Sequence, residues 1–259
     1  MSRIRLDIAL ERRGLAQSRA RARDAVLRGT VTVNGVATGK PSQLVGENDA
    51  IALNDPASRY VSRAALKLVE GLDKSGFDPT DKICLDLGAS TGGFSQVLAE
   101  RGARKIYAVD VGHGQLHGDV AALSKVVSLE GVNARDLGAE TIAEPVDLLV
   151  SDVSFVSLTK IIDAPSALCA PGAQAILLIK PQFEVGRDHI GKGGIVMPGP
   201  HVAAAVEAVM AHMEALGWKR AGLWPSPIKG GDGNGEFLAA FEHRQDIFPF
   251  IQNVPTDPK

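Results

Sequence analysis

Residues 82–94, Lys-Ile-Cys-Leu-Asp-Leu-Gly-Ala-Ser-Thr-Gly-Gly-Phe, constrain the fold of this chain more than any other stretch. The apolar residues Ile83, Leu85 and Leu87 predict an extended segment that is buried, as in the middle of a parallel sheet. A turn with three glycines follows, and from Phe94 onward the apolar residues have helical spacing. A strand, a glycine turn and a helix together form a common ligand site at the carboxyl edge of an α/β sheet.

The glycine turn lacks the Gly-x-Gly-x-x-Gly pattern with which dinucleotide-binding loops approach a pyrophosphate. Asp86 lies just before its first glycine, and a carboxylate there favours a ligand with positive charge, such as a sulfonium. The turn therefore predicts S-adenosylmethionine rather than NAD, with an α/β domain that merely contains a glycine turn as the alternative. The predicted cofactor residues of this stretch are Asp86, Gly88, Ser90, Thr91, Gly92, Gly93 and Phe94.

The composition is that of an ordinary globular protein, with 45% hydrophobic and 22% charged residues in a chain of 259. No apolar run approaches the roughly 18 residues of a membrane span. The N-terminus also lacks the apolar core of a signal peptide. Cys84 and Cys169 both lie in apolar surroundings and suggest neither a disulfide framework nor a metal site. We therefore expect a cytoplasmic protein without a metal.

Positive charge is concentrated at the N-terminus. Residues 1–28 contain eight arginines and three acidic residues, a net charge of +5, whereas the whole chain carries −2. This asymmetry predicts an acidic partner for the N-terminal part of the chain.

Residues 3–53 have the pattern of a small separate unit. A short amphipathic segment ends at a glycine, Ser18 can cap a second helix over residues 19–28, and a strand then leads into a hairpin turn at Asn34-Gly35. The unit contains the motifs Arg-Leu-Asp-x-x-Leu, Gly-Leu-Ala-Gln-Ser-Arg, Gly-x-Val-x-Val-Asn-Gly and Lys-Pro-Ser. With these motifs it resembles an S4 RNA-binding domain.

The resemblance implies that the basic face of the second helix contacts RNA phosphates, which give affinity rather than sequence choice. The alternative is a solvated helix face. A glycine-rich loop over residues 184–199 adds two further basic residues, and a loop of this length is usually functional or mobile. The candidate RNA-binding residues are Arg5, Arg19, Arg21, Arg23, Arg28, Arg187 and Lys192.

The rest of the chain alternates predicted strands and helices. The pattern predicts a helix that begins after a capping Ser62, a helix over residues 158–169 and another over 201–216. Two final strands, joined directly through a glycine-rich turn, must pair antiparallel. A mostly parallel sheet that ends in an antiparallel hairpin is typical of S-adenosylmethionine methyltransferases. Strands are expected over residues 83–87, 105–110, 126–129, 145–152, 173–180, 216–224 and 236–242.

Two further carboxylates are candidates for the cofactor site. Asp110 ends the second of these strands, where a carboxylate in a βαβ unit can accept hydrogen bonds from ribose hydroxyls. An aspartate that caps a turn is the alternative there. Asp136 lies in the loop after the third strand and could accept a hydrogen bond from the exocyclic amine of an adenine.

Four charged residues fall where the carboxyl ends of the strands meet: Lys67, Asp152, Lys180 and Glu236. Each alone could be a solvated lysine or an edge carboxylate. Their order resembles the Lys-Asp-Lys-Glu tetrad of the FtsJ-like ribose 2′-O-methyltransferases. With the S4-like unit, the chain from about residue 3 to 243 resembles the rRNA methyltransferases of the TlyA or hemolysin A type. The motifs that carry this resemblance are Gly-Ala-Ser-Thr-Gly-Gly-Phe, Asp-Val-Gly-His-Gly-Gln-Leu, Ser-Asp-Val-Ser-Phe and Lys-Pro-Gln-Phe-Glu-Val-Gly.

The resemblance implies methylation of a ribose 2′-hydroxyl in ribosomal RNA, with cytidine as the nucleoside, S-adenosylmethionine as the cofactor and ribosomal subunits as partners. Lys180 would be the general base or would stabilise the developing alkoxide. Asp152 and Glu236 would orient the lysines, and Asp152 would also border the cofactor. The implied fold class is α/β, a Rossmann-like class I methyltransferase domain with a terminal antiparallel strand, preceded by a small α+β S4 domain.

These patterns divide the chain into an S4-like domain over residues 1–54, a linker over 55–62, a methyltransferase domain over 63–245 and a tail over 246–259. Two other functions are alternatives. A pore-forming hemolysin needs an amphipathic or apolar membrane element and an export signal, and the sequence contains neither. A non-catalytic RNA-binding protein would not need all four residues of the tetrad.

Overall fold

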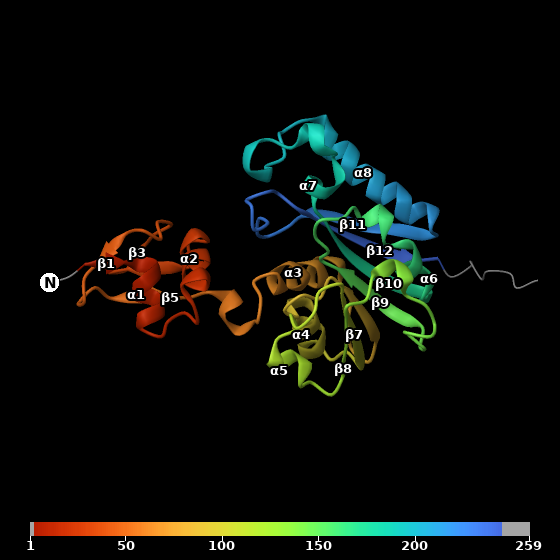
Figure 1. The fold of residues 1–259 in the computed structure, drawn as a ribbon, viewed down its shortest axis with the longest axis horizontal. Helices are drawn as coiled ribbons and strands as arrows, with labels where there is room; N and C mark the ends of the chain where they lie inside the picture. Colours follow the sequence, from red (N-terminus) through yellow and green to blue (C-terminus); the bar gives the residue numbers. More distant parts are fainter. Residues whose placement is uncertain (1–2, 245–259) are drawn as a thin grey trace, which may run out of the picture. The chain divides into compact units, whose positions relative to one another are not determined.

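The computed structural model describes residues 3–244, and its contacts divide the chain into two units between Arg59 and Tyr60. Figure 1 shows the smaller unit in red and the larger unit in orange to blue. Each unit has a hydrophobic core of its own. The tail expected over residues 246–259 lies outside the described residues.

The N-terminal unit packs two helices against short strands. Leu6, Leu10 and Val26 are fully buried between them. Ser18 Oγ accepts a hydrogen bond from the backbone N–H of Arg21 at 3.3 Å, which confirms the predicted helix cap. The elements are β1 (Ile4–Arg5), α1 (Leu6–Arg12), α2 (Arg19–Leu27), β2 (Val31–Val33), β3 (Val36–Ala37), β4 (Leu44–Val45) and β5 (Ile51–Leu53).

The predicted hairpin turn joins β2 to β3. Asn34 and Gly35 have φ angles of 50° and 80°, the two left-handed conformations that a type I′ turn requires. The segment predicted as a linker is not irregular throughout, because Pro56–Arg59 form the short helix η1 and Ala57 is buried. The backbone carbonyl of Ala57 accepts a hydrogen bond from the guanidinium of Arg21, so this helix belongs to the N-terminal unit.

A seven-stranded sheet, in the order β11-β12-β10-β9-β6-β7-β8, forms the centre of the larger unit. Strands β8, β7, β6, β9 and β10 are parallel, whereas β12 is antiparallel to both of its neighbours. The predicted α/β class and the antiparallel terminal strand are confirmed. The strands are β6 (Ile83–Leu87), β7 (Lys105–Asp110), β8 (Val126–Glu130), β9 (Val146–Ser151), β10 (Cys169–Ile179), β11 (Trp218–Pro225) and β12 (Phe237–His243).

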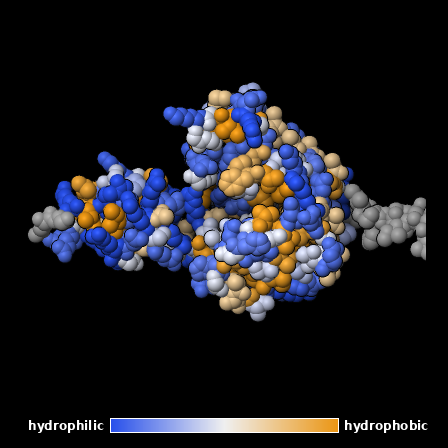
Figure 2. Space-filling model, viewed as in Figure 1, coloured by the Kyte–Doolittle hydropathy of each residue, from blue (hydrophilic) through white to orange (hydrophobic). Residues whose placement is uncertain are grey.

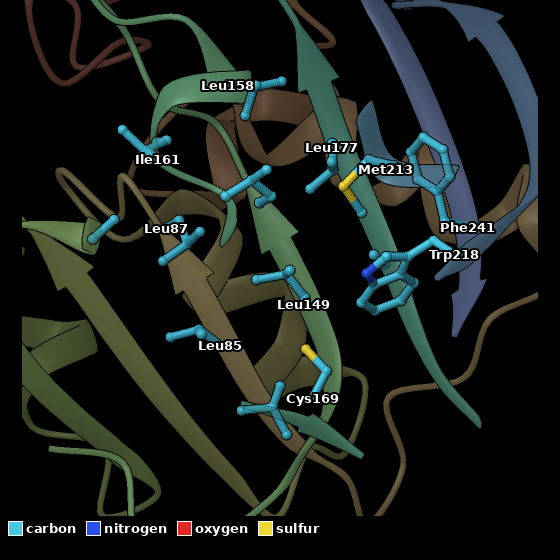
Figure 3. Close-up of a cluster of buried hydrophobic side chains, with 14 of the residues drawn as sticks. Leu85, Leu87, Leu149, Leu158, Ile161, Cys169, Leu177, Met213, Trp218 and Phe241 are labelled. Carbon is cyan, nitrogen blue, oxygen red and sulfur yellow. The ribbon is translucent and has the colours of Figure 1, made fainter. Parts of the chain in front are cut away.

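Helices cover both faces of this sheet. On one face α3 (Ala65–Ser75) and α4 (Gly93–Glu100) bury a core that includes Leu68 and Leu98. On the other face, α8 (Pro200–Ala215) contributes Met213, which lies near Leu177 and Trp218 in Figure 3. Short helices complete the connections: α5 (Gly118–Ala121), η2 (Ala134–Asp136), η3 (Leu158–Lys160), α6 (Asp163–Ala167), α7 (Pro181–Glu184), η4 (Arg187–His189) and η5 (Lys192–Gly194).

Two local predictions were wrong. The helix expected over residues 158–169 is broken into η3 and α6, and Cys169 already pairs with Val146 as the start of β10. Helix α3 begins at Ala65 instead of directly after Ser62, because residues 62–66 make the tighter i to i+3 bonds of a 3₁₀ turn. No helix within residues 3–244 is long and apolar enough to cross a membrane.

Candidate active site

Four charged side chains project from the same face of the sheet, at its carboxyl edge. Asp86, Asp152, Lys180 and Glu236 belong to the neighbouring strands β6, β9, β10 and β12, or directly adjoin them. Side chains along a strand alternate between its faces, so residues two apart share a face. Each of the four lies two positions from a residue of the core beneath α3 and α4, namely Cys84, Val150, Leu178 and Leu238.

Lys180 is held by three acceptors. Its Nζ lies 2.7 Å from Asp152 Oδ1 and donates to the backbone carbonyl of Asp152 at 3.2 Å and to Ser154 Oγ at 2.7 Å. The side chain of Lys180 is 9% exposed, so little water competes for these contacts. Pro181 follows as the first residue of α7 and ends the strand, which leaves Lys180 at the edge of the sheet.

Lys67 and Glu236 form a second ion pair. Lys67 extends from α3, and its Nζ lies 2.6 Å from Glu236 Oε2. Both side chains are almost fully buried, at 6% and 2% exposure. Glu236 directly precedes Phe237, which pairs with Ile179 next to Lys180. The sequence-predicted tetrad is therefore assembled as two lysine–carboxylate pairs at adjoining strand ends.

Two cavities open beside Lys180. The larger, of about 520 Å³, is lined by residues that include Val111, Asn133 and Phe155. The smaller, of about 140 Å³, is lined by residues of the glycine turn and by Lys180. The two cavities share four lining residues and therefore adjoin each other, and Lys180 lines the smaller one. The shared residues are Gly88, Ser90, Asp152 and Ser154.

The glycine turn is shaped for close approach. Gly88 has a φ of 76°, and a β-carbon there would lie 3.0 Å from the backbone of Val153. Gly92 has a φ of 91°, and its β-carbon would lie 2.8 Å from Leu116. Of the predicted cofactor residues in the turn, Thr91, Gly93 and Phe94 line the smaller cavity, whereas Gly92 only packs behind it.

Asp110 lies where the sequence predicts, on the wall of the larger cavity. Its two oxygens accept hydrogen bonds from the backbone N–H groups of Ser90 and Gly112, each at 2.8 Å. The carboxylate thereby ties the glycine turn to the loop after β7 and keeps lone pairs for a ligand. Asp136 is exposed and does not line the cavity; Asn133, Ala134 and Arg135 of the same loop do.

Asp86 is placed differently from the expectation that it faces a positively charged ligand. It is fully buried and lines neither cavity. Its Oδ2 accepts a hydrogen bond from Ser95 Oγ at 2.7 Å, in the first turn of α4, and its Oδ1 has no partner among residues 3–244. Burial, with a smaller contribution from the charge of Asp152, raises the pKa of Asp86 to about 7. Asp86 therefore supports the turn from behind.

The arginines predicted to bind RNA fall into two groups. Arg5 and Arg19 both bond to the buried carboxylate of Asp7 but remain 41% and 54% exposed. Arg28 is only 14% exposed, because it pairs with Asp24 and Asp55 inside the N-terminal unit. Its guanidinium is thus a structural group, which corrects its expected place on the RNA-binding face.

Three predicted RNA-binding residues remain exposed and uncommitted. The side chains of Arg23, Arg187 and Lys192 make no hydrogen bond or ion pair with the part of the chain that the structure describes. Arg21 donates to Gln17 and to the backbone of η1. Hydrophilic residues, in blue, cover most of the face of the N-terminal unit that Figure 2 shows.

The sequence did not single out Ser154 or Phe155, although both line the larger cavity. Phe155 is 91% exposed, has a φ of 66° and packs against Phe183 with ring centroids 5.4 Å apart. An aromatic residue in a left-handed conformation is an outlier that often marks a functional loop. The motif Ser-Asp-Val-Ser-Phe contains both residues, but no residue pattern predicts which loop side chains will reach Lys180.

Residues 60–243 match the FtsJ-like methyltransferase family, and residues 4–51 match the S4 domain. The chain belongs to the FtsJ-like methyltransferase family. This finding confirms the resemblance drawn from the tetrad and the glycine turn.

Relatives of this FtsJ-like methyltransferase match over nearly its whole length. It is 41% identical to the 16S/23S rRNA (cytidine-2′-O)-methyltransferase TlyA of Mycobacterium tuberculosis, over 91% of this chain and 88% of that protein. It is 38% identical to Hemolysin A of Brachyspira hyodysenteriae, over 92% and 99%. The solved structure of a candidate hemolysin from Streptococcus thermophilus superposes with a TM-score of 0.72 at 37% identity, over 94% and 90%.

Proposed function

We propose that this enzyme transfers a methyl group from S-adenosylmethionine to a ribose 2′-hydroxyl of ribosomal RNA, with cytidine as the target nucleoside. The observation that carries the proposal is Lys180, which lines the smaller cavity and contacts the carboxylate of Asp152 and the hydroxyl of Ser154, two residues that line both cavities. The relative named TlyA supports the RNA substrate and the nucleoside. We place the reaction in the cytoplasm, on ribosomal subunits or their RNA.

The two cavities fit the methyl donor. S-adenosylmethionine, when bound, supplies an electrophilic methyl group on a sulfonium. The larger cavity has the apolar and amide groups that suit a nucleoside, with Asp110 available to ribose hydroxyls. The absence of a β-carbon at Gly88 lets the backbone of Val153 approach the turn closely, because that atom would lie 3.0 Å from it. Asp110, Gly88, Ser90, Thr91, Gly93 and Phe94 would hold the donor.

Methyl transfer forms a bond from the ribose oxygen to the methyl carbon, breaks the bond from that carbon to sulfur, and releases the hydroxyl proton. A lysine amine could accept that proton, or a lysine ammonium could stabilise the charge that develops on the oxygen. The two hydrogen bonds that Nζ of Lys180 donates and its ion pair with Asp152 favour the second role, in which the hydroxyl proton passes to solvent. Much of the rate would then come from alignment of the hydroxyl.

The Lys67–Glu236 pair has a supporting role in this proposal. Both groups are buried, and a buried ion pair holds its partners in a fixed geometry because separating them leaves an uncompensated charge. Lys180 and Glu236 directly adjoin the paired residues Ile179 and Phe237 of β10 and β12. The pair would therefore fix the end of β12 and the first turns of α3 around the catalytic lysine.

RNA binding is proposed for exposed arginines of the S4 domain and for the loop that contains Arg187 and Lys192. These side chains would contact phosphates, which position a nucleic acid and supply affinity that falls with salt. The proposed set keeps Arg5, Arg19, Arg21 and Arg23. It leaves out Arg28, because that side chain forms ion pairs inside the N-terminal unit.

The test measures methyl transfer and cofactor binding separately. Ribosomal subunits from cells that lack this enzyme are incubated with labelled S-adenosylmethionine and either wild-type protein or Lys180→Ala. We expect label in RNA with the wild type, at least about 10³-fold less with the variant, and equal cofactor affinity by calorimetry. A variant that lost cofactor binding and activity to the same degree would refute the assignment of Lys180.

A further inference from the structure

Three oxygens surround Nζ of Lys180 in the structure. Nζ forms an ion pair with Asp152 Oδ1 at 2.7 Å, and it donates hydrogen bonds to the backbone carbonyl of Asp152 at 3.2 Å and to Ser154 Oγ at 2.7 Å. An ammonium has no further donor and no lone pair. Lys180 can therefore bind a substrate oxygen only if one of these three acceptors leaves.

Ser154 is the acceptor that can leave. Asp152 Oδ1 is a charged partner, and the backbone carbonyl is fixed at the end of β9, so both are held firmly. Ser154 is a neutral hydroxyl on an exposed loop residue, and its side chain needs only a rotamer change to release Lys180. It also lines both cavities, which puts its oxygen on the surface that the substrate must approach.

The loop conformation supports a specific role for this contact. Phe155, the next residue, adopts the left-handed φ of 66°, which costs free energy for a residue with a β-carbon. Such a conformation persists only where the surroundings determine it. The Lys180–Ser154 hydrogen bond is one contact that holds the loop in this state.

We propose that Ser154 is a positioning residue that occupies, in the substrate-free enzyme, the place on Lys180 that the ribose hydroxyl takes in the complex. The proposal rests on the function proposed above. A serine hydroxyl and a ribose hydroxyl are equivalent acceptors for an ammonium. The exchange therefore keeps Lys180 fully hydrogen-bonded before and after RNA binds, and keeps its Nζ directed at the site of transfer.

This exchange predicts a specific coupling between Ser154 and the substrate hydroxyl. If the target nucleotide lacks its 2′-hydroxyl, Ser154 keeps its hydrogen bond to Lys180, and the complex loses little binding affinity. If Ser154 is also absent, the deoxy complex leaves an N–H of Lys180 without a partner in a largely buried site, which is strongly unfavourable. Removal of the serine should therefore make the enzyme more sensitive to the loss of the hydroxyl.

The experiment is a thermodynamic cycle on binding. The methylated nucleotide is first located with wild-type enzyme, and two RNA fragments are made that differ only in a 2′-hydroxyl or a 2′-hydrogen at that nucleotide. Their Kd values are measured by fluorescence anisotropy with S-adenosylhomocysteine present, so that no transfer occurs. We expect wild type to prefer the hydroxyl fragment by less than about two-fold and Ser154→Ala to prefer it by about ten-fold.

Two further variants sharpen the result. Ser154→Thr keeps the hydroxyl and should restore the wild-type preference. Ser157→Ala removes a hydroxyl that bonds to Glu184 at 2.6 Å in the same loop, and should leave the preference at its wild-type value. A preference that is equal in wild type and Ser154→Ala would overturn the proposal, because a purely structural serine weakens both fragments alike.

A preference that falls in Ser154→Ala would also overturn the proposal, since it would mean that the serine contacts the substrate hydroxyl directly. Failure of the proposed function is visible separately. A wild-type enzyme that transfers no methyl group to RNA would exclude the function before any fragment is made, and the inference with it.

Discussion

Replacement of Asp86 by asparagine should make the stability of the larger unit less dependent on pH. Asp86 has no exposed surface, and its Oδ1 has no partner among the described residues. Burial, opposed by the hydrogen bond from Ser95 and increased by the charge of Asp152, raises the pKa of this carboxyl from its ordinary 3.8 to about 7. The folded protein therefore binds a proton at this site more tightly than the unfolded chain does.

The direction and the size of this pH dependence follow from the difference between the folded and the unfolded pKa of Asp86. Between pH 3.8 and about 7 the folded state holds a proton that the unfolded state has released, so stability falls as the pH rises and levels off above 7. From about pH 5.5 to about pH 8 the loss amounts to about 2 kcal/mol. Asparagine cannot ionise and lacks this loss, although its buried amide donor has a pH-independent cost of about 1–3 kcal/mol.

The assay is urea unfolding followed by tryptophan fluorescence at these two pH values. Both tryptophans, Trp218 and Trp224, lie in β11, so the signal reports the larger unit alone. The free energy of unfolding of Asp86→Asn minus that of wild type should be about 2 kcal/mol larger at the higher pH than at the lower pH. A companion variant, Ser95→Ala, removes a bond that lowers the pKa and should extend the loss to higher pH. An unchanged gap between Asp86→Asn and wild type at both pH values would refute the reasoning.

Three other perturbations test separate parts of the account. Lys67→Ala leaves Glu236 buried without its partner and should lower the free energy of unfolding by about 3–5 kcal/mol in the same assay. Lys67→Met combined with Glu236→Leu should lower it far less. Equal losses in the two proteins would contradict this. Gly88→Ala forces a β-carbon to within 3.0 Å of a backbone at a φ of 76° and should weaken cofactor binding at least about ten-fold by calorimetry, without unfolding the protein. Arg23→Ala should reduce the salt dependence of RNA binding by about one unit of slope and leave the Tm unchanged. Arg28→Ala should instead lower the Tm. A change in Tm with Arg23→Ala and in the salt slope with Arg28→Ala would contradict both assignments.

Most of the fold could be predicted because its signals are local and repeated. The buried strand at residues 83–87, its glycine turn and the regular return of apolar segments specify a parallel sheet, and the short final connection specifies the antiparallel strand. The prediction of a helix over residues 158–169 was wrong because local signals alone do not decide this segment. Its apolar residues suit either a helix or a buried strand, and Cys169 is drawn into β10 by pairing with Val146, a contact that the local pattern does not encode.

The site could be predicted as a set of residues but not as a set of contacts. The strand ends brought Asp152 and Lys180 together because parallel strands share a carboxyl edge. The burial of Asp86 behind the glycine turn depends on which face of β6 it occupies and on Ser95 in α4. Arg28 likewise follows a basic helix directly, and only the fold of the next segment directs it to Asp55 instead of to solvent.

The position of the methyl group in the product is the measurement that tests the central claim most directly. RNA labelled by the wild-type enzyme is hydrolysed with alkali, which cuts every linkage next to a free 2′-hydroxyl and spares a linkage next to a 2′-O-methyl group. The arrangement of Lys180, Asp152 and Ser154 predicts that the label survives in an alkali-resistant dinucleotide. Label recovered in a mononucleotide with a methylated base would contradict the account.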